Sequence, residues 1–233
     1  MSARILVWDL PLRIFHWVLA ASFAAAFLTA DSERLRDLHL LCGYTFAGAI
    51  AFRLVWGFVG SRHARFSALR FGPAAIGRYL RSLLAGRPER HEGHGPIATV
   101  MIPVLLGLGI AVAASGWAIH AEWGGEWLEE AHEAAAGAML AAVVFHVVGV
   151  VVVSVLQREN LVLPLVTGRK RGTPSQAIRS SRPVAALLLL AALAALWLPA
   201  LTARERAARE RLARNALAVH SIDPAGERAS HSD

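Results

Sequence analysis

The stretch HEAAAGAMLAAVVFHVVGVVVVSVL, residues 132–156, decides the fold of this chain. It is long and apolar enough to cross a bilayer as one α-helix, which needs about 20 mostly apolar residues. His132 opens the stretch, and His146 follows fourteen residues later. At about 100° and 1.5 Å per residue, both rings lie on one face of the helix, about 21 Å apart along its axis. This spacing suits two stacked ligand sites.

Four further apolar stretches occur in the chain. Of its 233 residues, 55% are hydrophobic, and the mean hydropathy is +0.46. We expect membrane spans at residues 14–30, 38–59, 97–119, 132–156 and 183–201. Each should be a helix, because an open strand edge in lipid leaves backbone groups without hydrogen-bond partners. The sequence therefore predicts an all-α integral membrane protein, with a four-helix transmembrane bundle and a fifth, C-terminal transmembrane helix.

The charged residues between the spans predict the orientation. Two connections are basic, and they contain Arg62, Arg65, Arg70, Arg78, Arg81, Arg87, Arg90, Arg158, Arg169, Lys170, Arg171, Arg179 and Arg182. The other two are acidic: one has Asp31, Glu33 and Asp37 with two arginines, and the other has Glu122, Glu126, Glu129 and Glu130 with no Lys or Arg. By the positive-inside rule, the amino terminus is cytoplasmic and the acidic connections face outward. A fifth crossing places the tail from Thr202 outside, where its arginines fit the rule less well.

Cleavage of the first stretch as a secretory signal is an alternative. Its apolar run is long for such a signal, and VWDLP at residues 7–11 is not a plain basic region. No convincing small-residue cleavage site precedes the acidic connection. We therefore expect the first stretch to remain as a span.

The net charge of +7 and the pI of 11.0 do not indicate nucleic-acid binding. The basic residues follow the membrane topology, so anionic lipid head groups are their expected neighbours. With Cys42 as the single cysteine, the chain has no intrachain disulfide and no C-x-x-C-H attachment site for a c-type haem. A haem would therefore be held by coordination and packing alone.

Depth in the membrane pairs four histidines. His16 lies near the cytoplasmic start of the first span, and His39 lies near the outer end of the second. His132 is near the outer surface in the fourth span, and His146 is about four turns deeper. His16 can therefore meet His146, and His39 can meet His132. Two bis-histidine sites in a four-helix bundle suit two non-covalent b haems, because neutral imidazole is a good axial ligand and apolar walls exclude water.

Core packing and zinc binding are the alternatives for these histidines. Ionisable residues within spans are rare and costly, so four at matched depths are unusual as plain core residues. A zinc motif H-E-x-x-H is not completed, because Ala136 stands where its second histidine would be. His120 is an alternative outer ligand. Solvated side chains are expected for the loop and tail histidines, which are His63, His91, His94, His220 and His231.

Two arginines and four glycines could serve a planar cofactor. Arg53 shares a helix face with His39 at the inner level, where it could pair with haem propionates or extend to the cytoplasmic interface. Arg13 has the same two interpretations, and both could line a quinone pocket. The glycines could admit the macrocycle or a neighbouring helix; they are Gly43, Gly48, Gly137 and Gly149.

Two further patterns indicate contact with a membrane surface. Tryptophans near the span ends predict an interfacial belt of Trp8, Trp17, Trp56, Trp117, Trp123 and Trp127. Residues 73–84 alternate apolar side chains with arginines, which predicts an amphipathic helix on the cytoplasmic face. Residues 203–219 should form a further helix, because they are rich in Ala, Arg and Glu.

Several short motifs give the chain a family resemblance. They begin with WDLP at 8–11, Arg13, FHW at 15–17, His39 and Gly43-Tyr44. They continue with Arg53, Trp56-Gly57, Gly60, ARF at 64–66, His132-Glu133, His146, RENL at 158–161 and GRKR at 168–171. In this order and spacing, the chain resembles the prokaryotic cytochrome b561 and nickel-hydrogenase b-type cytochrome family from about residue 7 to residue 171.

The resemblance implies a dihaem cytochrome domain at 1–171, with two b haems held by His16, His39, His132 and His146. Residues 172–233 are then a linker, the fifth helix and a charged tail. It also implies respiratory electron transfer across the membrane, between the quinone pool and a partner at the outer surface such as a c-type cytochrome or hydrogenase.

Three alternative functions remain open. The protein could be a stand-alone oxidoreductase that passes electrons from a small donor such as superoxide to quinone. It could be the cytochrome b anchor subunit of a hydrogenase or c-type cytochrome complex. A transporter without haem is the third alternative.

Overall fold

Long helices make up most of the protein in the computed structural model, which describes residues 3–69, 72–86 and 95–222. Five helices are long and apolar enough to cross a membrane. They are α1 (Leu10–Leu28), α2 (Arg36–Val59), α4 (Pro96–His120), α5 (Glu126–Gln157) and α7 (Pro183–Ile222). These confirm the all-α membrane fold, although α1 and α5 begin about one turn or more before the predicted spans.

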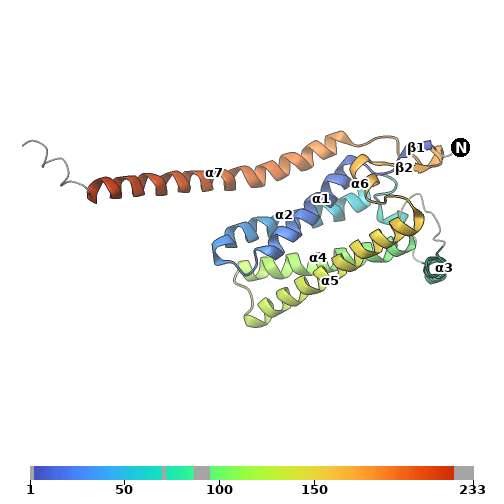
Figure 1. The fold of residues 1–233 in the computed structure, drawn as a ribbon, viewed down its shortest axis with the longest axis horizontal. Helices are drawn as coiled ribbons and strands as arrows, with labels where there is room; N and C mark the ends of the chain where they lie inside the picture. Colours follow the sequence, from blue (N-terminus) through green and yellow to red (C-terminus); the bar gives the residue numbers. More distant parts are fainter. Residues whose placement is uncertain (1–2, 70–71, 87–94, 223–233) are drawn as a thin grey trace, which may run out of the picture. The chain divides into compact units, whose positions relative to one another are not determined.

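The first four long helices pack side by side (Figure 1). α1 packs along α2, α2 along α4, and α4 along α5. Phe23, Phe46, Ile50 and Met139 form the buried centre of this bundle. By contrast, valines along α5 are exposed, among them Val147, Val151 and Val155. An apolar exterior of this kind suits a lipid environment, where exposed apolar side chains meet hydrocarbon chains instead of water.

A buried carboxylate begins α1. The Asp9 side chain accepts a hydrogen bond from the Leu12 backbone N–H at 2.9 Å, and Pro11 occupies the first turn, where its missing N–H has no cost. Asp9 is fully buried and also accepts hydrogen bonds from the Trp56 indole and the Ser61 backbone. The start of α1 is therefore joined to the segment that follows α2.

A two-stranded sheet is present that the sequence did not predict. β1 (Ala3–Leu6) pairs antiparallel with β2 (Arg169–Gly172), with Arg4 opposite Arg171. Each strand has four residues, which is too short for a periodic signal. Between the strands and the helices, Val7 and Trp8 both donate backbone hydrogen bonds to Gly168 O. Gly168 has φ +76°, and a Cβ there would lie 2.9 Å from Trp8 O, so glycine is required.

Short elements complete the chain. They are η1 (Glu33–Leu35), η2 (Phe66–Ala68), α3 (Pro73–Leu84), α6 (Leu163–Thr167) and η3 (Pro174–Gln176). The predicted helix at 73–84 is confirmed as α3, which packs against α4 and buries Tyr79. The strands, α3 and α6 gather at one end of the bundle, opposite the α4–α5 connection (Figure 1).

The chain forms two compact units, Met1–Leu187 and Leu188–Asp233. Most of α7 belongs to the second unit. With 40 residues, α7 is about 60 Å long, roughly twice the hydrocarbon thickness of a bilayer. The helix expected at 203–219 is confirmed as a continuation of this same helix, which ends at Ile222.

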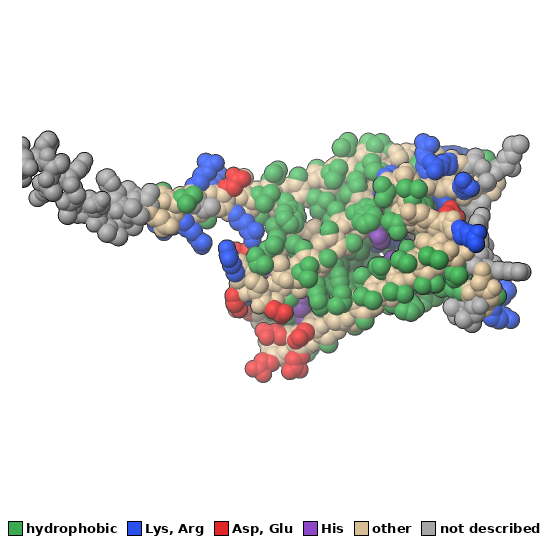
Figure 2. All heavy atoms as spheres, in the orientation of Figure 1, with side chains coloured by type: hydrophobic (Ala, Val, Ile, Leu, Met, Phe, Trp, Pro, Cys, Tyr) green, Lys and Arg blue, Asp and Glu red, His purple; other side chains and the backbone are tan. Residues whose placement is uncertain are grey.

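Opposite charges collect at the two ends of the bundle. Figure 2 shows acidic side chains gathered where α4 meets α5, and basic side chains at the other end. We call the first the acidic end; it contains Arg34 and Arg36 together with the more numerous Asp31, Glu33, Asp37, Glu122, Glu126, Glu129 and Glu130. We call the second the basic end, with Arg4, Arg62, Arg65, Arg78, Arg81, Arg158, Arg169, Lys170 and Arg171. The bundle is therefore polarised along its long axis.

Candidate cofactor site

The structure brings the four predicted histidines together in two pairs. His16 on α1 is close enough to His146 on α5 for their charges to interact. His39 on α2 and His132 on α5 interact in the same way. The first pair lies toward the basic end and the second toward the acidic end, because His39 and His132 lie within the first two turns of α2 and α5, which begin at the acidic end. All four side chains are partly buried.

A hydrogen bond orients each ring of the acidic-end pair. His39 Nδ1 lies 2.8 Å from Ala26 O, and a carbonyl oxygen can only accept, so His39 Nδ1 is the protonated nitrogen. His132 Nδ1 lies 2.9 Å from Ser115 Oγ. In both rings the other nitrogen, Nε2, is left as the atom that could bind a metal. This is the arrangement in which a ligating histidine is held by its second nitrogen.

Gly116 makes room for the His132 ring. A Cβ at this position would lie 2.9 Å from His132 Cε1 and 3.4 Å from His132 Nδ1. Separations below about 3 Å do not occur between real side chains, so any larger residue displaces the ring. Ser115 and Gly116 are neighbours on α4, so one turn of this helix both bonds and accommodates His132.

Two glycines near the histidines leave their Cβ positions open. α5 makes few close backbone contacts with α1 or α2, the helices whose histidines it faces. Gly43 lies four residues after His39, and Gly149 lies three after His146, so each shares a helix face with its histidine. Both are partly buried, and a Cβ at either would meet nothing within 4 Å. Paired imidazoles on the same helix faces as these glycines are residues that fit a haem.

The other two predicted glycines lie elsewhere. Gly48 is nine residues after His39, and Gly137 is nine before His146, which places each on the opposite side of its helix. Both are exposed. They therefore do not face the histidine pairs, and only Gly43 and Gly149 suit the predicted role.

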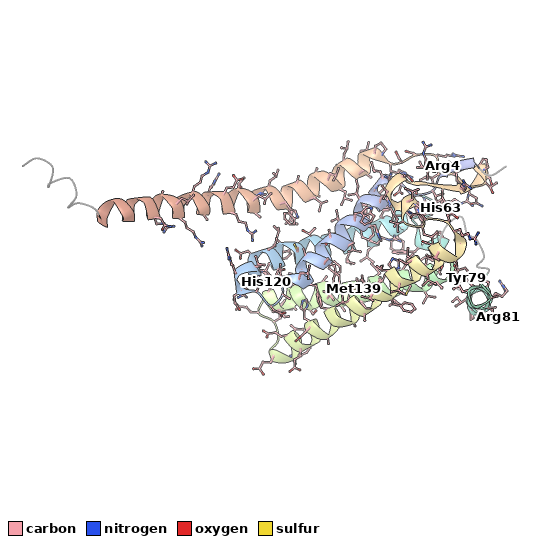
Figure 3. All side chains as sticks on the ribbon, in the orientation of Figure 1. Arg4, His63, Tyr79, Arg81, His120 and Met139 are labelled. Atoms are coloured by element: carbon pink, nitrogen blue, oxygen red, sulfur yellow. The ribbon has the colours of Figure 1, made fainter. Side chains whose placement is uncertain are left out.

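An apolar layer separates the two pairs. Phe23 lies seven residues after His16, Phe46 seven after His39, and Met139 seven from both His132 and His146. All three are buried, and the Phe23 and Phe46 ring centroids are 5.7 Å apart. Figure 3 shows Met139 between the ends of the bundle marked by His63 and His120. The two histidine pairs are therefore distinct sites with a dry layer between them.

Arg53 is engaged within the protein. It is 5% exposed, so it does not extend to the membrane surface. Its Nη1 donates to Ala64 O at 3.0 Å, and its guanidinium carbon lies 4.7 Å from the centre of the Phe66 ring. Arg53 also interacts electrostatically with Asp9. Asp9 before α1, Arg53 in α2 and the segment from Ala64 to Phe66 after α2 thus form one buried network.

Arg13 contacts a different segment. Its Nε donates to Leu165 O at 3.2 Å, and its Nη2 donates to Val166 O, both in α6. A cation at the end of a helix compensates the partial negative charge of the last carbonyls. The contacts of Arg13 and Arg53 use only some of the N–H groups of each guanidinium. The roles of both arginines toward a cofactor stay predictions.

Two residues, His63 and Trp56, differ from the expectations. His63 is buried and not solvated, because its Nε2 donates to Gln176 O at 2.8 Å and its ring contacts Trp8 edge-on. Trp56 does not belong to an interfacial belt, since it is 7% exposed and hydrogen-bonded to Asp9. His120 is exposed and packs edge-on against Tyr44, while Ser115 and Gly116 occupy the part of α4 that touches His132. His91, His94 and His231 lie outside the described residues.

Sequence reasoning missed Ser115, Gly116 and Asp9. A serine next to a glycine within an apolar span is a usable signal, because small residues mark close helix contacts. An aspartate two residues before Pro11 is a recognisable N-cap. The partners of both, however, come from other helices.

Comparison with known proteins agrees with this arrangement. The family model described as prokaryotic cytochrome b561 matches residues 7–168. A protein from Rhodobacter capsulatus, named "Probable Ni/Fe-hydrogenase B-type cytochrome subunit", is 23% identical over 70% of this chain and 80% of its own length. Proteins from Rhizobium leguminosarum bv. viciae and Escherichia coli K12 with corresponding names are each 26% identical, over 51% and 50% of this chain.

The chain spans 61% and 60% of the lengths of these last two relatives. No solved structure matches. The family match covers both histidine pairs and the buried network around Asp9 and Arg53. The chain belongs to the prokaryotic cytochrome b561 family.

Proposed function

We propose that this chain is the membrane cytochrome b subunit of a hydrogenase-type complex and that it passes electrons between a partner at its acidic end and quinone. The observation that carries the proposal is the placement of two histidine pairs at two depths of one bundle. The names of the relatives favour a hydrogenase as the partner.

His16 and His146 would hold one b haem, and His39 and His132 the other. A bound haem would supply one-electron chemistry, alternating between ferric and ferrous iron. The chain provides the axial nitrogens, orients them, and keeps water away with the layer of Phe23, Phe46 and Met139. Two such sites would connect the two surfaces of the membrane.

The charge distribution supports one orientation of the bundle in the bacterial inner membrane. The basic end carries nine of the fifteen lysines and arginines that the structure describes outside α7, and basic connections remain on the cytoplasmic side. The acidic end, with its pair His39 and His132, then faces outward, where the redox partner binds. Quinone exchanges electrons near the opposite pair, with Arg13 and Arg53 as its predicted neighbours.

The test begins with the purified full-length chain. We would measure the reduced-minus-oxidised absorption spectrum and quantify haem per chain, in the wild type and in His146→Ala. We expect about two b haems in the wild type and one in the variant. A wild-type protein without haem would overturn the proposal.

A second measurement tests the partner. The chain is purified under mild conditions from cells that express a nickel-iron hydrogenase, and haem reduction by hydrogen is followed. Reduction that requires the copurified hydrogenase supports the subunit function. Full reduction of the isolated chain by superoxide, coupled to quinone reduction, would instead establish a stand-alone oxidoreductase.

A further inference from the structure

The two histidine pairs differ in what holds their rings. Each acidic-end histidine has a hydrogen bond at Nδ1, from His39 to Ala26 O and between His132 and Ser115 Oγ. Within residues 3–69, 72–86 and 95–222, neither His16 nor His146 has a hydrogen bond at a ring nitrogen. The ring contact of His16 is the edge of Trp17, 5.6 Å away between centroids.

Ser115 has one proton to donate. Its Oγ lies 2.7 Å from Ala111 O, which can only accept, so the hydroxyl proton goes to that carbonyl. The hydroxyl oxygen can then accept from His132 Nδ1–H at 2.9 Å, beside the Val112 backbone, which also hydrogen-bonds with His132. The acidic-end pair therefore consists of two imidazoles that both donate their Nδ1–H to oxygen.

We propose that Ser115 and the Ala26 carbonyl make the acidic-end histidines the stronger electron donors to iron, so that the haem bound there has the lower reduction potential. An imidazole that donates its N–H to oxygen becomes more basic at its other nitrogen. A more basic axial ligand stabilises ferric iron over ferrous iron. Ser115 is a positioning residue, because it acts through His132.

This inference rests on the proposed function and assigns it a direction. With haems bound, an electron that moved from the acidic-end site to the basic-end site would oxidise the first and reduce the second, with a decrease in free energy. Two such electrons, together with two protons from water, would convert one quinone to quinol at the basic end. The redox partner at the acidic end is then the electron source.

The experiment is a spectroelectrochemical titration of the full-length protein. His146→Ala retains only the acidic-end haem, which assigns the two potentials. We expect the acidic-end haem of the wild type to have the lower potential. Ser115→Ala should keep both haems and shift the acidic-end ferric-to-ferrous equilibrium about tenfold toward ferrous iron, equivalent to about 59 mV for one electron.

Matched variants separate the hydrogen bond from packing. Ser115→Thr keeps the hydroxyl, so the acidic-end haem should retain its wild-type potential. Valine has nearly the same shape as threonine but no hydroxyl, so Ser115→Val should shift this potential as Ser115→Ala does. Ser22→Ala removes a buried hydroxyl that bonds only Leu19 O among the described residues, and it should leave both potentials unchanged.

Three results would overturn the inference without touching the proposed function. They are a higher wild-type potential at the acidic end, a Ser115→Ala shift confined to the basic-end haem, and equal potentials for Ser115→Thr and Ser115→Val. If the Ser115 variants lose the acidic-end haem, the wild-type protein still tests the inference, because the acidic-end haem must have the lower of its two potentials. Absence of haem from the wild type would instead be a failure of the proposed function.

Discussion

Asp9 and Trp56, 47 residues apart in sequence, meet in a buried hydrogen bond in which the indole Nε1 donates to Asp9 Oδ2 at 3.1 Å. The same carboxylate caps α1 through Leu12 N and receives Ser61 N. A single side chain thus joins the start of α1, the last turn of α2 and the segment after it. His16 and Arg53 lie on the two helices that it joins.

Removing this carboxylate should destabilise the basic end of the bundle. We expect Asp9→Ala to lower the free energy of unfolding by about 2–4 kcal/mol, because a helix cap is lost and buried donors are left without an acceptor. Thermal unfolding in detergent measures the change. Asp37→Ala is the control, since Asp37 is exposed in the first turn of α2; an equal loss in both variants would contradict the structural role of Asp9.

The site of Gly116 predicts a specific loss of cofactor. Gly116→Ala places a methyl group 2.9 Å from His132 Cε1 and should displace the ring. We expect the haem content to fall from about two to about one per chain, with the remaining haem at the basic end. Gly107→Ala on the same helix meets nothing within 4 Å and should keep both haems. Two haems in Gly116→Ala would show that the ring tolerates the methyl group.

Replacement of His120 distinguishes the two candidate ligands at the acidic end. His132→Ala should remove one haem, because His132 faces His39. His120→Ala should remove none, since His120 is exposed and contacts Tyr44. Haem quantification checks both variants, and a loss confined to His120→Ala would reverse the assignment.

A close contact between Gly57 in α2 and Phe66 in η2 predicts a second steric effect. The Gly57 Cα faces the Phe66 ring, and a Cβ there would lie 2.0 Å from Phe66 Cε2. We expect Gly57→Ala to lower the free energy of unfolding by about 1–3 kcal/mol through overpacking. Gly77→Ala has open space in α3 and should be neutral or stabilising by up to about 1 kcal/mol. Equal stability of both variants would mean that Phe66 moves aside without cost.

The sequence by itself determined the membrane spans, the charge difference between the bundle ends and the depths of the four histidines. These properties follow from composition and helical periodicity, which depend on residues close together in the chain. The depth argument also predicted which histidines meet, because helices of fixed rise and alternating direction leave few ways to match His16, His39, His132 and His146. Whether they bind haem remains a proposal.

Only the tertiary structure decided what surrounds each histidine. The contact of Ser115 and Gly116 with His132 depends on how α4 is rotated against α5, and the hydrogen bond from His39 to Ala26 depends on how α1 packs on α2. The burial of His63 and the pairing of β1 with β2 likewise join segments more than a hundred residues apart. Such contacts are set by the packing of side chains from separate elements, which no local pattern encodes.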